Sequence, residues 1–357
     1  MFKKLFGKGD KVKAPKGFHT LEISAITKLT DDTVKVEFNV PSNLSAQFGF
    51  TPGQYLNFSI DIDGSEERRS YSICSGPNEP IAVAVKRVKD GKVSTWFTTE
   101  AEVGQPIFVA SPDGNFTRPK EVKNVIAIAA GSGITPIMAM AKAAQGSDRT
   151  IQLFYGSRNE GQIIFKSELD ELTNTKTTYY LSGEEKSGFG SGRIDKDEFS
   201  TIVKSDLEIL KADGFFICGP EQLVADVIAV LELFGVDSAK IHYELFTTPV
   251  LLKSNTEDES NDFSGTSKVT VVLDDESITF DLAADGPAIL DKVNNEGFDA
   301  PYSCKGGVCC TCKAKVIEGK VTMTVNYSLT DNEVEEGYIL TCQSHPASET
   351  LKLTYDD

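Results

Sequence analysis

The sequence has no excess of basic residues, no long apolar run and no secretory leader pattern. Its 357 residues include 53 Asp and Glu against 36 Lys and Arg, a formal net charge of −17. Phosphate backbones attract Lys and Arg, so this balance argues against a general nucleic-acid-binding protein. No apolar run is long enough to span a membrane, and the basic N-terminus lacks the apolar segment of a secretory signal. These absences predict a cytoplasmic protein with no nucleic-acid and no membrane partner.

What the sequence does contain is a group of cysteines near its C-terminal end. In a reducing compartment, seven cysteines favour metal, cluster or catalytic use over disulfides. Cys304, Cys309, Cys312 and Cys342 follow the spacing C-x4-C-x2-C, then 29 residues, then C. Plant-type [2Fe–2S] ligands have this spacing, so these four thiols are the predicted metal ligands. The alternatives are buried structural thiols or a zinc site, although zinc ribbons pair two C-x2-C knuckles and only one is present.

The loop PYSCKGGVCCTC supplies three of these thiols. Gly306 and Gly307 allow backbone angles and close approaches that a Cβ would block. Cys310 should point away from Cys309, which makes it a packed thiol, and Cys74 has no predicted role. The segment resembles the plant-type ferredoxin domain, because KVTVVL, SITFDL and PAILDKVNNEG precede the loop as strand, strand and helix. This resemblance implies a β-grasp α+β ferredoxin domain over residues 268–357.

The rest of the chain divides into two regions and a tether. Residues 17–118 contain six short β-like runs separated by turn signals, which predicts an antiparallel β-barrel. Residues 119–250 alternate strand-like and helical runs, with IIFKSELDEL among the helical ones, which predicts an α/β domain with a parallel sheet. Residues 251–267 are mostly polar and acidic and are predicted to be a linker. The fold class is therefore multidomain.

Two motifs of the barrel region are candidate binding elements. Along the strand ERRSYSICS, the motif Arg69-Ser70-Tyr71-Ser72 can serve a flat phosphorylated ligand through ring stacking, phosphate pairing and a hydroxyl donor. The alternative is an exposed polar strand. The second motif combines a basic strand end with a short helix whose N–H groups can face an anion. Its residues are Lys86, Val93, Ser94 and Thr95. The alternative there is an ordinary Ser/Thr helix cap.

Three motifs of the parallel-sheet region lie where strands end. AAGSGITP is a Gly-rich strand-to-helix turn that can bind a phosphate at a helix N-terminus. The alternative is a strand-to-helix turn without a ligand. Cys218, followed by Gly219 and Pro220, ends another strand, and a lone cysteine there can simply be a core residue. Glu244 closes the region beside aromatic residues, where a glutamate is usually a solvated surface residue.

The order of these motifs resembles the ferredoxin–NADP reductase superfamily. The resemblance implies that Arg69, Ser70, Tyr71 and Ser72 hold a flavin, with Ser72 near its reactive nitrogen. It implies that Lys86, Val93, Ser94 and Thr95 lie at the ribityl and phosphate part. It implies a nicotinamide dinucleotide site built by Gly131, Ser132, Gly133, Thr135, Pro136, Gly219 and Pro220. Cys218 and Glu244 would flank the place where nicotinamide meets flavin. FAD rather than FMN follows from the resemblance alone.

The complete domain order resembles one branch of that superfamily, the reductase subunits of phenylacetyl-CoA epoxidases and related oxygenases. YGSRNEGQIIF and VCCTCKAKVIEGKV carry this likeness. It implies that electrons pass from NADPH through FAD and a [2Fe–2S] cluster to an oxygenase partner. The alternative is a general reductase for other acceptors, such as ferredoxin, other hydroxylases or quinone. Residues 268–357 carry 16 acidic and 7 basic side chains, which either steers a basic partner or maintains solubility.

The choice between NADPH and NADH depends on the residues beside the ribose. Ser157 and Arg158 follow the second parallel strand and favour a 2′-phosphate. Gly183 stands where phosphate-binding relatives often carry Arg, and Glu184 would repel phosphate. We therefore favour NADPH, with NADH as the alternative.

Overall fold

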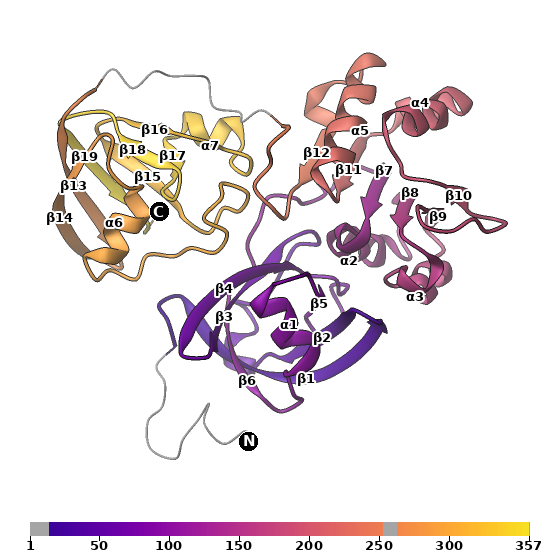
Figure 1. Ribbon diagram of the computed structural model, residues 1–357, viewed down its shortest axis with the longest axis horizontal. Coiled ribbons are helices and arrows are strands. Elements are labelled where there is room, and N and C mark those ends of the chain that lie inside the picture. Colours follow the sequence, from indigo (N-terminus) through magenta and orange to yellow (C-terminus); the bar gives the residue numbers. More distant parts are fainter. Residues whose placement is uncertain (1–13, 253–262, 357) are drawn as a thin grey trace.

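The computed structural model describes residues 14–252 and 263–356, which form three sheet-based units (Figure 1). The basic segment 1–13, residues 253–262 of the predicted linker, and residue 357 lie outside the described residues. An antiparallel barrel, a parallel α/β sheet and a C-terminal mixed sheet follow one another along the chain. The predicted three-part fold class is confirmed. No helix within the described ranges is long and apolar enough to cross a membrane.

The first unit is a six-stranded antiparallel sheet that curls into a barrel. Its strands, in spatial order, are β4 (Ser65–Ser72), β3 (Tyr55–Ile62), β6 (Pro106–Ala110), β1 (Phe18–Thr30), β2 (Thr33–Asn39) and β5 (Ala82–Lys86). A bridge between Ile73 and Val83 connects the two edge strands and closes the barrel. Helix α1 (Lys92–Thr99) buries Trp96 and Phe97 against this core. The six predicted strands are all present.

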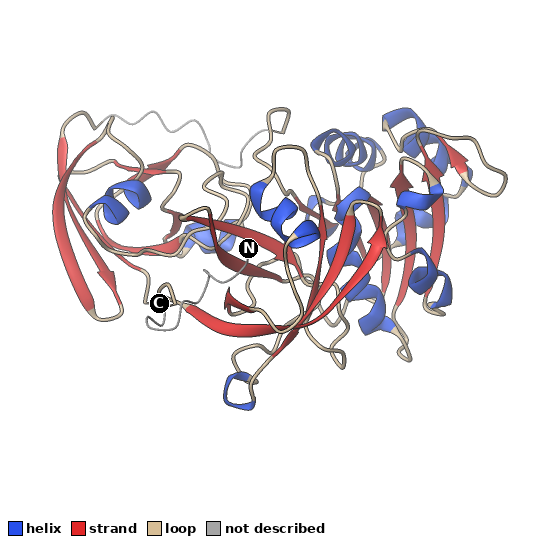
Figure 2. Ribbon diagram, turned by 60° about the horizontal axis from the view of Figure 1, so that its bottom comes forward, coloured by secondary structure: helices blue, strands red, loops and turns tan. Residues whose placement is uncertain are grey.

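The second unit is a parallel sheet with helices on both faces (Figure 2). Its strands, in spatial order, are β10 (Gly190–Ser191), β9 (Thr175–Leu181), β8 (Thr150–Ser157), β7 (Asn124–Ala130), β11 (Gly214–Cys218) and β12 (Ile241–Glu244). Its helices are α2 (Ile134–Ala144), α3 (Lys166–Glu171), α4 (Lys196–Ser205) and α5 (Glu221–Leu233). Alternate residues of β7 face opposite sides, with α2 and α3 over one core and α4 and α5 over the other.

The strand order of this sheet reverses between β7 and β11. The chain winds outward from β7 through β8, β9 and β10, then returns to the other side of β7 with β11 and β12. In open α/β sheets, ligands bind outside the carboxyl ends of the strands at such a switch point. The ends of β7 and β11 are the GSG and CGP motifs.

The third unit has the β-grasp arrangement. Its main sheet contains β14 (Glu276–Ala283), β13 (Thr266–Leu273), β19 (Thr350–Thr354), β15 (Lys313–Glu318) and β17 (Tyr338–Leu340). A small second sheet pairs β16 (Val321–Met323) with β18 (Ser344–Pro346). Helices α6 (Ile289–Asn295) and α7 (Asp331–Glu335) complete the unit. The cysteine loop lies between α6 and β15.

One predicted helix is shorter than expected. The run IIFKSELDEL was predicted to be helical throughout, but α3 spans only Lys166–Glu171. Ile163 is extended and Phe165 has a left-handed backbone with φ of 62°. Ile163, Ile164 and Phe165 are instead buried against the α2 side of the sheet, so tertiary burial outweighs local helix preference there.

Candidate functional site

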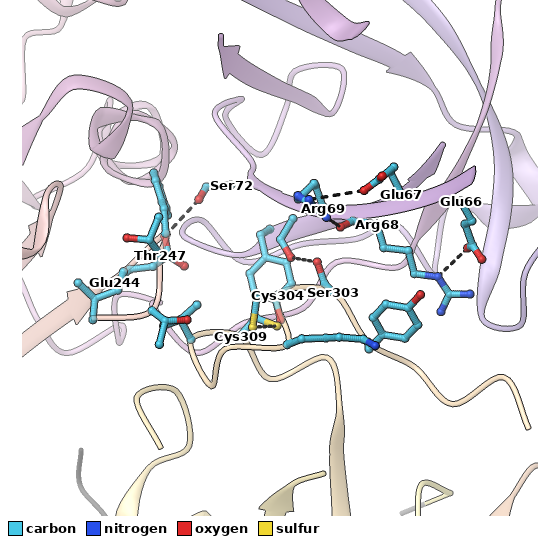
Figure 3. Close-up of a pocket in the computed structure, with 18 residues that line it drawn as sticks. Glu66, Glu67, Arg68, Arg69, Ser72, Glu244, Thr247, Ser303, Cys304 and Cys309 are labelled. Atoms are coloured by element: carbon cyan, nitrogen blue, oxygen red, sulfur yellow. Dashed lines mark hydrogen bonds and ion pairs between the residues drawn. The ribbon is translucent and has the colours of Figure 1, made fainter. Parts of the chain in front are cut away.

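Functional residues of all three units meet at one cavity of about 490 Å³ (Figure 3). Strand β4 contributes Ser70 and Ser72, the end of β12 and the segment after it contribute Glu244 to Thr248, and the cysteine loop contributes Cys304 and Cys309. A cavity of this size is large enough for a cofactor ring system. Residues more than 170 positions apart therefore form one site.

Ser72 and Glu244 contact each other in the wall of the cavity. The Ser72 hydroxyl donates a hydrogen bond of 3.1 Å to the Glu244 carboxylate. Burial raises the pKa of Glu244 to about 8, and the hydrogen bond from Ser72 opposes part of this effect. Glu244 is also paired in register with Cys218 on β11, whose thiol is fully buried. The resemblance implied that Ser72, Cys218 and Glu244 lie near one another, and in the structure Glu244 neighbours both Ser72 and Cys218.

Of the other residues of the RSYS motif, Arg69 and Ser70 also line this cavity, whereas Tyr71 does not. Successive side chains of a strand point to opposite sides, so Arg69 and Tyr71 alternate with Ser70 and Ser72 along β4. Tyr71 packs edge-on against Phe97 of α1, with ring centroids 5.6 Å apart. Ser70 hydrogen-bonds to Asn57 and to Ser303 of the cysteine loop, at 2.6 Å each.

Arg69 lies beside the N-terminal turn of α1. Glu67 bridges the Arg69 guanidinium at 3.6 Å and Lys92 Nζ at 2.5 Å. Two cations next to a helix N-terminus can hold a phosphate group. Val93 and Ser94 are buried in this turn, and Ser94 Oγ donates to the Gly91 carbonyl at 3.1 Å. None of Lys86, Val93, Ser94 and Thr95 lines the main cavity.

The strand-to-helix turn at the switch point depends on two glycines. A Cβ on Gly133 would lie 2.0 Å from the Cys218 carbonyl oxygen, and one on Gly219 would lie 3.2 Å from the Ala130 backbone nitrogen. The ends of β7 and β11 can therefore approach only because both positions lack side chains. Residues 131–133 form a single 3-10 turn that continues into α2, with Thr135 donating to the Ser132 carbonyl at 2.9 Å. This turn presents N–H groups at the switch point.

Of the predicted ribose-side residues, Ser157 is the buried last residue of β8, and the others lie on two adjacent loops. Arg158 is exposed directly after β8, and the Gly183 N–H donates to its carbonyl at 2.7 Å. A Cβ on Gly183 would lie 2.9 Å from that carbonyl, so a side chain there would displace Arg158. The Glu184 carboxylate accepts a hydrogen bond from the Glu160 N–H at 2.8 Å. Arg158 is thus an exposed cation at this edge, and Lys186, which pairs with Glu160, is another.

The four predicted ligand thiols lie as two pairs. Cys309 donates to Cys304 with 3.1 Å between the sulfurs, and Cys312 donates to Cys342. These hydrogen bonds lower the pKa of the two accepting thiols, Cys304 and Cys342. Within residues 14–252 and 263–356, no three His, Cys, Asp or Glu side chains converge as they would around a single metal ion. A [2Fe–2S] cluster has two irons and four thiolate ligands, so two thiol pairs fit its donor set.

The loop geometry also fits the cluster. The Gly306 N–H donates to Cys304 Sγ at 3.3 Å, and the Gln343 amide donates to Cys342 Sγ at 3.5 Å. Such donors stabilise the negative charge of a cluster. Gly307 has a left-handed φ of 76°, and a Cβ on Gly306 would lie 1.9 Å from Thr248 Oγ1. Cys310 is buried, and its thiol donates to the Ser328 carbonyl at 3.3 Å, as expected of a packed thiol.

Sequence reasoning missed the residues that join the barrel to the cysteine loop. Asn57 donates to Thr311 Oγ1 at 3.0 Å, and the Tyr55 hydroxyl accepts the Cys310 N–H at 3.2 Å. Tyr55 also donates to Asp113 at 3.2 Å. A polar side chain in a strand carries no signal of a partner 250 residues away, so these contacts could not be read from the sequence.

Comparison with known proteins identifies the class to which this fold and site belong. Residues 20–117 match the oxidoreductase FAD-binding domain, residues 127–228 the oxidoreductase NAD-binding domain, and residues 271–347 the 2Fe–2S iron–sulfur cluster binding domain. The chain belongs to the family of NAD(P)H-dependent oxidoreductases that combine these three domains and serve as reductase components of oxygenases.

Individual relatives match over nearly the whole chain. The chain is 35% identical over 352 residues to the E component of 1,2-phenylacetyl-CoA epoxidase from Escherichia coli K12, covering 95% of this chain and 98% of that protein. It is 32% identical to the ferredoxin reductase component of 3-ketosteroid-9-alpha-monooxygenase from Rhodococcus rhodochrous, covering 96% and 99%. The structure of phthalate dioxygenase reductase superposes with a TM-score of 0.58 at 24% identity, covering 95% and 98%. That structure shares the fold.

Proposed function

We propose that this protein carries electrons from NADPH through FAD and a [2Fe–2S] cluster to an oxygenase partner of the phenylacetyl-CoA epoxidase kind. The observation that carries the proposal is the single cavity shared by Ser72, Glu244, Cys304 and Cys309. When bound, the nicotinamide supplies a hydride, the flavin converts this electron pair into single electrons, and the cluster accepts them one at a time. This cavity would bring a flavin held at Ser72 and a cluster held at Cys304 and Cys309 within reach of each other.

The chain's own residues orient the bound groups. The ends of β7 and β11 would hold the dinucleotide at Gly131, Ser132, Gly133, Thr135, Pro136, Gly219 and Pro220. Arg69 and the first turn of α1 would hold the flavin phosphates, where Glu67 now bridges two cations. Ser72 and Glu244 would face the flavin ring, and Glu244 can hold a proton near neutral pH because burial raises its pKa to about 8. Arg158 favours NADPH over NADH.

The cluster would be held by Cys304, Cys309, Cys312 and Cys342. Its domain carries a net charge of −9 over residues 268–357, more than half of the chain's −17. An acidic surface there would steer a partner with a basic docking patch into a short-lived complex. None of the seven cysteines, all of which lie in the described part of the chain, forms a disulfide, which is compatible with the reducing, cytoplasmic location that we propose.

The test is anaerobic reduction of the purified holoprotein. Flavin and iron–sulfur absorbance should be present together, and NADPH should bleach both. If neither NADPH nor NADH reduces either centre, the reductase function is wrong. Reduction of both centres without transfer to a reconstituted phenylacetyl-CoA epoxidase oxygenase component would leave a reductase with a different acceptor.

A further inference from the structure

An ion pair connects the barrel to the cysteine-bearing domain through a buried arginine. Arg68, next to Arg69 on β4, has only 1% of its side chain exposed. Its Nη2 donates to Asp299 Oδ1 at 2.7 Å, and its Nε donates to Glu66 at 2.6 Å (Figure 3 shows the Glu66 contact). Asp299 lies between α6 and the cysteine loop, 231 residues further along the chain. The pair therefore joins two domains.

Aromatic and main-chain groups surround this pair. The Arg68 guanidinium lies 4.5 Å from the ring centroid of Tyr302 in the cysteine-bearing domain and 5.2 Å from that of Phe18 in β1. The second carboxylate oxygen of Asp299 accepts the main-chain N–H of Lys16 at 3.0 Å. Lys16 Nζ also pairs with Asp274 at 2.7 Å. Asp299 is thus held by two separate segments of the barrel side.

The energetics of this arrangement favour specificity over stability. A buried ion pair contributes little net stability because both charges lose water. Here Arg68 Nη1 is buried and finds no hydrogen-bond partner among the described residues, which adds to the cost. Asp299, with 42% of its side chain exposed, keeps part of its hydration. Separation of the domains would return water to both charges, so the contact is suited to reversible docking.

The neighbouring contacts of β3 and β4 with the cysteine loop are neutral. Ser70 hydrogen-bonds to Ser303 and Asn57 to Thr311. Neutral hydrogen bonds have little long-range effect, whereas an ion pair orients approaching surfaces and penalises a wrong register. We propose that Arg68 is a positioning residue whose ion pair with Asp299 sets the docking of the cysteine-bearing domain on β4.

This inference rests on the proposed function in one respect only. If the cavity holds the flavin, docking determines how fast the flavin reduces the cluster, with each electron lost by the flavin converting one ferric ion to ferrous. The ion pair changes neither donor nor acceptor. Docking itself is a property of the chain and can be measured separately.

The experiment compares the full-length holoprotein with Asp299→Asn, Arg68→Met and the double variant. The control is Glu296→Gln, which breaks the ion pair between Lys292 and Glu296 inside the same domain. Small-angle X-ray scattering should give a larger radius of gyration for Asp299→Asn, which leaves the buried Arg68 charge without this carboxylate, than for the wild type and the control. A higher salt concentration should also increase the radius of gyration of the wild type, because salt stabilises the separated charges of Arg68 and Asp299. An unchanged radius in Asp299→Asn would overturn the proposal.

Stopped-flow reduction supplies the second readout. Electron transfer from flavin to cluster should slow about tenfold or more in Asp299→Asn, while flavin reduction by NADPH keeps its wild-type rate. The double variant should be no slower than the slower single variant, because both remove one interaction. If the rate losses of the two single variants add up in the double variant, Arg68 and Asp299 do not act through one shared ion pair. A wild type whose flavin never reduces its cluster would refute the proposed function, and the scattering result would still decide the docking role.

Discussion

The Ser72 hydroxyl donates a hydrogen bond to the Glu244 carboxylate at 3.1 Å, joining residues 172 positions apart. This contact links β4 of the barrel to the last strand of the parallel sheet. It lies in the cavity that also reaches Cys304 and Cys309. The hydroxyl and the carboxyl together form a polar wall that can place or hold a proton beside a bound flavin.

Replacing Ser72 with Ala should slow the reduction of the flavin by NADPH by roughly tenfold to a hundredfold, as expected when a positioned hydrogen-bond donor is lost from a reacting centre. Flavin content and the iron–sulfur spectrum should not change, since the hydroxyl binds neither the flavin phosphates nor the cluster. Anaerobic stopped-flow absorbance measures this rate. Equal rates in the wild type and Ser72→Ala would show that the hydroxyl takes no part.

Glu244→Gln should change how stability depends on pH. Burial raises the pKa of Glu244 from 4.5 to about 8, so the folded protein binds its proton more tightly than the unfolded chain. The wild type therefore loses stability as pH rises from about 5 to 8, relative to the Gln variant, by an amount on the order of 5 kcal/mol, because each pH unit in that window contributes about 1.4 kcal/mol. Thermal denaturation at several pH values should show similar melting temperatures below pH 5 and a more stable variant above pH 8.

A pH-independent difference between the two proteins would mean that folding leaves the pKa of Glu244 unchanged. The same comparison applies to the hydride step. If the proton on Glu244 takes part in hydride transfer, the wild-type rate of flavin reduction should change near pH 8. The rate of Glu244→Gln should not depend on pH in this range.

The thiol pairs predict which cysteine substitutions remove the cluster. Cys304→Ser or Cys342→Ser should abolish the iron–sulfur absorbance while the flavin remains bound, because each pair would lose one ligand. Cys310→Ser is the matched control, since its thiol donates to a main-chain carbonyl and a hydroxyl can do the same. Absorbance and electron paramagnetic resonance after dithionite reduction measure the outcome. Intact iron–sulfur bands in Cys304→Ser would show that the ligand assignment is wrong.

Arg158→Gln should weaken NADPH binding and leave NADH binding almost unchanged. The side chain is exposed after β8, and Gly183 leaves space for it. Losing one cation–phosphate contact should raise the KM for NADPH by roughly tenfold. Steady-state reduction of ferricyanide with each nucleotide tests this. The same rise in KM for both nucleotides would mean that Arg158 does not contact the 2′-phosphate.

Gly133→Ala should be more harmful than Gly131→Ala. A Cβ at position 133 would lie 2.0 Å from the Cys218 carbonyl oxygen and would force β7 and β11 apart, at a cost of about 3 kcal/mol. A Cβ at position 131 meets nothing within 4 Å and carries only the strain of its φ of 56°, about 1 kcal/mol. Thermal denaturation measures both. Equal losses of stability in the two variants would argue against close packing of β7 and β11 at the switch point.

Much of the architecture could be predicted because its signals are local. Short β-like runs between turn signals indicated the six barrel strands, and strand–helix alternation indicated the parallel sheet. The spacing of Cys304, Cys309, Cys312 and Cys342 pointed to four ligands, and these thiols lie together. The helix at residues 163–172 was overestimated, since burial of Ile163 to Phe165 depends on packing that local preference does not report.

The sequence by itself therefore determined the three domain types and the candidate residues, since backbone preference, hydrophobic periodicity and cysteine spacing act over short stretches of chain. It did not determine how those domains meet. The contact between Ser72 and Glu244, the ion pair between Arg68 and Asp299, and the hydrogen bond between Tyr55 and Cys310 exist only in the folded chain. Each joins residues more than 170 positions apart, and their energies depend on distance and on loss of water, which arise when the surfaces come together.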